Sequence, residues 1–231
     1  MDSTNLAQEI TTHLLSRGLH PSPTWLTTTF LPTIRPTTPL PALKQTALFR
    51  LLASDITQTL QRTPSSVFPP DIHNATIRER RLAGPIAVQV LDIEDIGRSR
   101  WSQVEALEAA ERGETTKGRE IIRAVRAEDG GEGADADADV AGSGGPHKLV
   151  LQDAQGVNVF GIELTAVEGV GVGMNIGAKI VLRDVLVARG VVLLEPGSVK
   201  VEGGKIEGVH KAWREGRKER LKSAAGITER G

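Results

Sequence analysis

Residues 147–164 read HKLVLQDAQGVNVFGIEL, and this stretch decides the fold. Two short runs rich in aliphatic and β-branched residues, 148–153 and 157–164, flank the turn residues 154–156, so we predict a β-hairpin. The same period of two predicts further strands at 85–91, 177–182, 191–194 and 199–201. Short strands separated by glycine turns indicate a five-stranded closed barrel of the oligonucleotide/oligosaccharide-binding (OB) type, which we place at 85–204.

The chain before the barrel predicts helices. Two segments repeat apolar residues at helical spacing, the stretch containing Leu6, Ile10 and Leu14 and the stretch 41–60. Between them, Pro23 in a first turn favours a short helix at 23–30. The apolar face of the third helix comprises Leu48, Leu51, Leu52, Ile56 and Leu60, with Phe49 at its edge. Residues 1–62 are therefore predicted to form a three-helix domain, followed by a proline-containing linker at 63–84. The fold class predicted for the whole chain is accordingly α+β.

A long insertion, 97–147, separates the first two predicted strands, where a barrel normally has a short turn. Its second half contains mostly glycine, alanine and acidic residues, so we expect 128–146 to be disordered. Its first half holds two apolar clusters at helical spacing. Either these clusters form helices that fold back on the barrel, or they are ordered by a partner. On the second interpretation, the partner-binding residues are Arg98, Trp101, Val104, Leu107, Ile121, Ile122 and Val125.

Residues 205–231 are predicted to form a basic C-terminal helix and a tail. Basic residues of this helix alternate with Glu215 and Glu219, so it either forms solvated ion pairs or makes weak, salt-sensitive contacts with DNA. The candidate DNA contacts are Lys211, Arg214, Arg217 and Lys218. Lys179 opens the fourth predicted strand and is either a solvated lysine at the strand end or a contact with a protein partner at the barrel rim.

The composition excludes several chemistries. The 231 residues include no cysteine and no tyrosine, which excludes disulfides, thiolate or phenolic nucleophiles and cysteine-ligated zinc. The sequence has no phosphate-binding glycine motif and no nucleophile elbow, and its five histidines lack metal-binding spacing. We therefore expect no enzymatic activity, cofactor or metal, and a cryptic hydrolase would need a site that the sequence does not reveal. No signal peptide or membrane-spanning run is evident, so no membrane partner is expected.

Three segments carry a family resemblance. They are LAGPIAVQVLDIEDIGRSRWSQVE (82–105), HKLVLQDAQGVNVFGIEL (147–164) and GMNIGAKIVLRDVLVARGVVLLEPGSVKVEGG (173–204). The most specific motif lies at 190–204 and matches the family pattern G-V-L-L-L-x-P-x-x-V-x-V-x-G-G except for Val192 at the third position. Together with the N-terminal helices and the long insertion, these segments resemble the N-terminal region of the RecQ-mediated genome instability protein 1 family.

The resemblance implies a non-catalytic nuclear subunit without a cofactor. Members of this family bind a type IA topoisomerase III and a Bloom-type RecQ helicase, which together dissolve double Holliday junctions. In the family the OB domain docks on the topoisomerase, the insertion reaches the enzyme's gate, and contact of the subunit with junction DNA is weak or indirect. The alternative is an autonomous module for single-stranded DNA. Such modules stack bases on aromatic side chains, and the predicted strands offer only Phe160.

Overall fold

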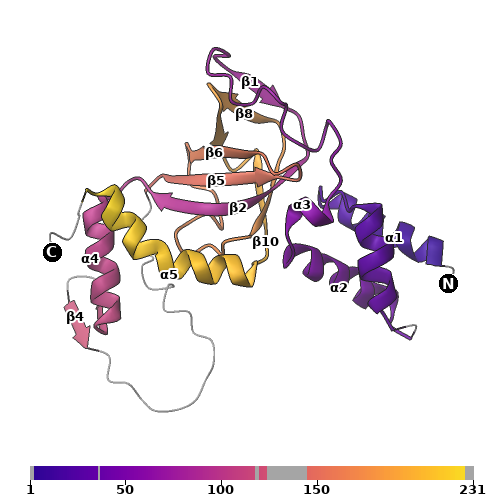
Figure 1. Cartoon of the computed structure of the whole chain (residues 1–231), viewed down its shortest axis with the longest axis horizontal. Helices are drawn as coiled ribbons and strands as arrows, with labels where there is room; N and C mark the ends of the chain where they lie inside the picture. The colour runs from indigo at the N-terminus through magenta and orange to yellow at the C-terminus, as the bar shows by residue number, and fades with distance from the viewer. Residues whose placement is uncertain (1–2, 36, 118–119, 124–144, 227–231) are drawn as a thin grey trace.

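The computed structural model describes residues 3–35, 37–117, 120–123 and 145–226, and shows a group of helices beside a curled β-sheet (Figure 1). The N-terminal elements are α1 (Ser3–Ser16), a π-helical turn (Trp25–Phe30), a 3₁₀ turn (Leu31–Thr33), α2 (Leu40–Leu52) and α3 (Ile56–Thr59). The sheet contains β1 (Arg80–Leu82), β2 (Ile86–Asp95), β5 (His147–Asp153), β6 (Asn158–Glu163), β7 (Lys179–Leu182), β8 (Val185–Ala188), β9 (Val191–Leu194) and β10 (Val199–Gly203). The insertion contributes α4 (Arg100–Glu111), β3 (Glu114–Lys117) and β4 (Glu120–Arg123), and the last element is α5 (Glu207–Ala224).

The eight strands of the main sheet follow the order β1-β8-β9-β6-β5-β2-β7-β10, and only the β6–β9 pair is parallel. Arg183 and Asp184 alone separate β7 from β8, and residues 195–198 separate β9 from β10. At this break the Arg183 N–H donates to the Ser198 carbonyl (2.9 Å), so the β8–β9 and β7–β10 ladders are two halves of one bent hairpin. The eight strands therefore correspond to five long strands, two of them bent, plus the edge strand β1. The predicted α+β fold with an OB-type barrel is confirmed.

The inward-facing residues of these strands fill the interior of the barrel. Fully buried examples are Val88, Val90, Leu149, Leu151, Val192 and Leu194. Phe68 and Ile72, from the segment predicted to be a linker, belong to the same core. The Phe68 N–H also donates to Asp153 Oδ2 (2.8 Å). Part of the segment between the helices and the sheet is thus packed as a component of the barrel.

The N-terminal helices share a second hydrophobic core, which includes Ile10, Leu14, Trp25, Phe30, Leu51 and Ile56. The predicted third helix is interrupted at Asp55. Its side chain accepts a hydrogen bond from the Thr57 N–H (2.8 Å) and caps α3 as a separate short helix. Phe49 was expected at the edge of the apolar face but is 72% exposed, whereas Leu51 is fully buried.

The helical domain rests directly on the outer face of the barrel. Three barrel residues belong to the helical core: Ala87, Ala154 and Val181. The Gln89 side chain accepts from the Ile56 N–H (3.0 Å) and donates to Asp55 Oδ1 (3.2 Å), which fixes α3 on β2. Gly204 has a φ of 97°, and a Cβ there would lie 2.4 Å from the Leu52 carbonyl oxygen. Only glycine fits this approach of the barrel to the end of α2.

The insertion forms one helix and one hairpin within its described residues. The helix predicted for its first apolar cluster is confirmed as α4. The prediction of a helix for its second cluster is wrong, because residues 120–123 form strand β4, in which Ile122 pairs with Thr115 of β3. Both residues are β-branched, which favours strand pairing over a helix. Val125 lies outside the described residues, as does all of the segment predicted to be disordered except residues 145–146.

The insertion leaves and re-enters the barrel at one place, which we call the neck. Asp95 at the end of β2 pairs in register with His147 at the start of β5. One residue further out, the Ile96 N–H donates to the Pro146 carbonyl (3.0 Å). His147 Nδ1 forms a hydrogen bond with Glu163 Oε2 of β6, and both side chains are buried. The two ends of the insertion are therefore held together by the sheet itself.

Replacing Leu51 with aspartate should unfold the helical domain, because an unpaired carboxylate in an apolar core costs on the order of several kcal/mol. Thermal denaturation followed by circular dichroism measures the change in Tm. Phe49→Asp, two positions away in the same helix, is the matched control and should leave Tm nearly unchanged, since Phe49 is exposed. An equal loss of Tm in both variants would contradict the observed packing of α2.

Candidate protein-interaction surface

The outer face of the barrel divides into three sectors. The helical domain covers the first, around the start of β2 and β7. The second sector, around the end of β2, is covered by α5, which runs along this strand toward α4 (Figure 1). The third sector consists of the outward-facing residues of β5, β6 and β9. None of the elements described by the structure covers it.

We call this third sector the open sheet face and define it by Val150, Phe160, Ile162, Val191 and Leu193. Phe160 lies opposite both Val150 and Val191, and Ile162 lies opposite Leu193, so the five side chains form two adjacent rows. None of them is buried, and Phe160 is 53% exposed, whereas their alternate neighbours in the same strands face the core. A contiguous apolar surface of this kind on a soluble domain is typical of a protein interface.

Charged side chains connect the open sheet face with the base of the insertion. Lys148 Nζ lies 5.8 Å from the centroid of the Phe160 ring and 2.6 Å from Glu94 Oε2. Arg100 of α4 donates from Nε to Glu94 Oε1 (2.8 Å). Partial burial acts to raise the pKa of Glu94, but the hydrogen bonds from Lys148 and Arg100 outweigh it and lower the pKa below its usual value. Glu94 therefore stays ionised as a bridge between strand and helix.

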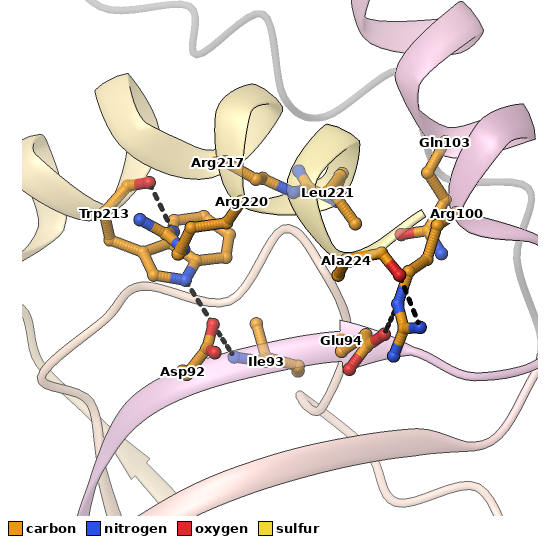
Figure 2. Close-up of a pocket in the computed structure, with 10 residues that line it drawn as sticks. All are labelled: Asp92, Ile93, Glu94, Arg100, Gln103, Trp213, Arg217, Arg220, Leu221 and Ala224. Atoms are coloured by element: carbon orange, nitrogen blue, oxygen red, sulfur yellow. Dashed lines mark hydrogen bonds and ion pairs between the residues drawn. The ribbon is translucent and has the colours of Figure 1, made fainter. Parts of the chain in front are cut away.

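Trp213 fixes α5 on the outer face of β2 (Figure 2). Its Nε1 donates to Asp92 Oδ1 (2.6 Å), which also accepts from the Ile93 N–H (2.9 Å). The guanidinium carbons of Arg217 and Arg220 lie 5.1 and 5.8 Å from the centroid of the Trp213 ring, a cation–π geometry. The indole is 6% exposed and belongs to the barrel core, so α5 is an integral part of the barrel.

The first half of α4 is anchored close to the neck. The Ser99 hydroxyl accepts from the Ser102 N–H (3.1 Å) and caps the helix. The Gln103 side chain donates to the Asp95 carbonyl (2.8 Å), and Val104 is fully buried beside it. The base of the insertion is thus held on the barrel by specific contacts of its own.

Two family comparisons match this architecture. Residues 68–217 match the family model described as RMI1, N-terminal OB-fold domain, and residues 14–59 match RMI1, N-terminal helical domain. The chain belongs to the RecQ-mediated genome instability protein 1 (RMI1) family. A relative of that name from Schizosaccharomyces pombe is 30% identical over 168 residues, which cover 68% of this chain and 69% of the relative. Membership of the RMI1 family supports a role in genome stability for this OB-fold chain.

A cleft of about 130 Å³ lies between β2, α4 and α5 of this RMI1-family chain, and Figure 2 shows the side chains that line it. Pockets for small molecules are usually larger than about 300 Å³, so this cleft is better explained as a joint between elements. No group of potential metal ligands occurs among the described residues. No helix in the described ranges is long and apolar enough to cross a membrane.

The predicted partner-binding residues of the insertion separate into buried and accessible ones. Val104 is fully buried within the chain, which fits the interpretation that the helix folds back on the barrel. Leu107 is half-buried, and Arg98 donates to the Ser102 hydroxyl (3.3 Å). Trp101 is 50% exposed and remains available to a partner. For the strand residues 121–122, the structure describes the backbone position only.

The candidate DNA-binding residues do not form one exposed surface. Arg217 is 9% exposed because it lies over the Trp213 ring, and Lys218 forms an ion pair with Glu111 of α4 (2.6 Å). Lys211 and Arg214 are exposed on the first half of α5. Phe160 is the only aromatic side chain on the described strands, which offers little base stacking for an autonomous single-strand module.

Lys179 does not lie at the barrel rim, and the prediction of an exposed contact there is wrong. The side chain is fully buried, and Nζ donates to the Gly177 carbonyl (2.7 Å). The helical domain packs over this part of the sheet, so a residue at the start of a strand becomes an interior one. Burial lowers the pKa of Lys179 to about 8, and the negative charge of Asp55 offsets part of this effect.

The open sheet face was not predicted, although the sequence contains a signal for it. Residues 191–194 read VVLL, so their strand is apolar on both faces rather than on alternate positions. Such a run indicates that both faces are covered by protein. It does not say whether the cover comes from the same chain or from a partner.

The buried lysine should produce an alkaline pH dependence of stability. In the unfolded chain Lys179 has its ordinary pKa of 10.5, so between pH 8 and 10.5 the unfolded state binds a proton that the folded state does not. The free energy of unfolding should therefore rise with pH across this window, by up to ~3 kcal/mol. Urea denaturation of wild-type and Lys179→Met protein measures the difference, because methionine removes the titrating group. No tyrosine or cysteine titrates in this range to obscure it. Parallel pH curves for the two proteins would contradict the assignment.

Proposed function

We propose that this chain is a non-catalytic nuclear subunit of a complex between a type IA topoisomerase III and a RecQ helicase. It would stimulate decatenation and the dissolution of double Holliday junctions, with the enzymes making most of the contacts with DNA. Membership of the RMI1 family supports this proposal, and so does the relative's name, which refers to RecQ. The structural observation that carries it is the open sheet face, an apolar surface that lies close to the base of a long insertion.

The open sheet face would provide the docking surface for the topoisomerase. Its five apolar residues lie on adjacent strands of a rigid sheet, so they present a preformed surface and lose little conformational freedom on binding. Through Lys148 and Glu94 it lies next to Arg100 of α4. A partner seated on this face would therefore also meet the insertion.

The insertion would act on the gate of the topoisomerase rather than supply most of the docking affinity. A segment that binds one state of a gate more tightly than the other shifts the balance between the open and closed states. Trp101, half exposed on the anchored helix α4, offers an apolar contact for such state-dependent binding. The first half of α4 would provide a fixed point from which the remaining insertion reaches the enzyme.

The docking proposal predicts that Phe160→Glu abolishes or strongly weakens co-purification with the topoisomerase III of the same organism. A carboxylate at the centre of an apolar interface loses its hydration without gaining a partner. Substitutions at such central positions commonly weaken the binding free energy by at least ~2 kcal/mol, about thirtyfold in Kd. Phe49→Glu is the matched control, because Phe49 is also an exposed phenylalanine but lies on the helical domain. Both variants should keep the wild-type Tm, which separates loss of binding from loss of folding. Undiminished binding by a folded Phe160→Glu protein would exclude the open sheet face as the docking site.

The gate proposal predicts that docking and stimulation can be separated. Replacing residues 113–144 with a short Gly/Ser linker keeps α4 and the neck, so complex formation should remain within about twofold of wild type. Decatenation and junction dissolution should be slower, because the part of the insertion that reaches the gate is gone. Gel-based assays of both reactions, at saturating subunit, measure the effect. If the shortened protein supports both activities at the wild-type rate, residues 113–144 are only a spacer.

A further inference from the structure

Basic residues in the second half of α5 face acidic residues of α4. Lys218 Nζ lies 2.6 Å from Glu111 Oε2, and Lys222 Nζ lies 3.1 Å from Glu108 Oε1. A spacing of four residues on α5 and of three on α4 places each pair of like charges on one helical face. Since the later lysine meets the earlier glutamate, the two helices run antiparallel with complementary charges along the contact.

The other end of α4 is tied to the same helix. Arg100 donates from a guanidinium nitrogen to the Ala224 carbonyl (3.2 Å), at the C-terminal end of α5 (Figure 2). The first half of α5 is in turn fixed to the barrel by the hydrogen bond of Trp213 described above. It is also held by His210, whose Nδ1 accepts from the Ile176 N–H (3.1 Å). A continuous series of contacts thus leads from the barrel through α5 to both ends of α4.

We propose that α5 orients the insertion. Lys218 and Lys222 hold the last turns of α4 and so set the direction in which the following residues leave the barrel. This inference rests on the proposed function, because the direction matters only when the insertion meets a topoisomerase. Gln103 and Val104 anchor the first half of α4 alone. The turns that carry Glu108 and Glu111 depend on the lysines of α5 for their position.

The ion pairs between α4 and α5 are suited to positioning α4 rather than to stabilising the fold. Both ion pairs are partly exposed, and pairs of this kind add little to global stability. Breaking them should therefore release the end of α4 while the barrel and the first half of α5 stay folded. The same ion pairs make Lys218 and Lys222 less available to nucleic acid.

Three variants test the proposal. Lys218→Glu/Lys222→Glu replaces attraction with repulsion along the contact. Adding Glu108→Lys/Glu111→Lys to that protein restores opposite charges with the signs exchanged. Lys211→Glu/Arg214→Glu is the control, because it makes the same change of charge on the first half of α5, away from the two ion pairs with Glu108 and Glu111.

Amide hydrogen exchange of the full chain reads out the position of α4 without any enzyme. The first variant should accelerate exchange in residues 107–111 by about fivefold, the effect of losing two partly exposed ion pairs, at an unchanged Tm. This variant should co-purify with topoisomerase III as the wild type does but should stimulate decatenation less. The charge-exchanged protein should regain the wild-type exchange rate in α4 and the wild-type stimulation. Unchanged exchange in α4, or no recovery on charge exchange, would overturn the proposal.

The control variant separates this proposal from binding of DNA along the helix. If Lys211→Glu/Arg214→Glu lowers stimulation as much as the first variant, the basic residues act on DNA and the positioning role is wrong. If wild-type protein neither binds nor stimulates topoisomerase III, the proposed function fails. The exchange measurement still decides whether α5 positions α4.

Discussion

Several strands of the barrel are apolar on both faces, and the rest of the molecule is arranged around this constraint. A barrel buries only the inward-facing side chains of each strand, so apolar side chains that face outward must be covered by other elements of the chain or by a partner. The helical domain covers the part around Ala87 and Val181, and α5 covers the end of β2 through Trp213. The open sheet face is what remains. The helical domain and the open sheet face therefore answer the same physical requirement at different places on one sheet.

The positions of the main elements could be read from the sequence, because periodicity is a local property. The runs at 85–91 and 148–153 lie within β2 and β5, apart from one flanking residue, Pro85. The interruptions were harder to predict. Asp184 has a φ of 47°, a conformation unusual outside glycine, and it breaks a long strand into β7 and β8. Asp55 similarly separates two helices, because its side chain caps the start of α3 shortly after α2 has ended. Each depends on the conformation of a single residue, which hydrophobic patterns do not record.

The candidate surface was less predictable, because exposure is decided by tertiary packing. Lys179 is charged and begins a strand, and both properties suggest an exposed position. It is buried because a domain more than a hundred residues earlier in the sequence packs over that strand. Phe160 shows the reverse, an aromatic residue in a strand that the fold leaves half exposed. The basic residues of α5 were recognised, but their acidic partners lie about a hundred residues away on α4, and sequence spacing could not pair them.

The closed neck also determines how the molecule carries mechanical load. Both ends of the insertion meet at Asp95 and His147, so a pull by a moving partner reaches the barrel at one end of the β2–β5 ladder. Such a pull loads both strands in the same direction, so it is resisted by the ladders that join β2 to β7 and β5 to β6. The first pairs in line are reinforced by side chains, since His147 is bound to Glu163 and Lys148 to Glu94. Tension in the insertion would thus enter the sheet at its central strands rather than at an edge strand.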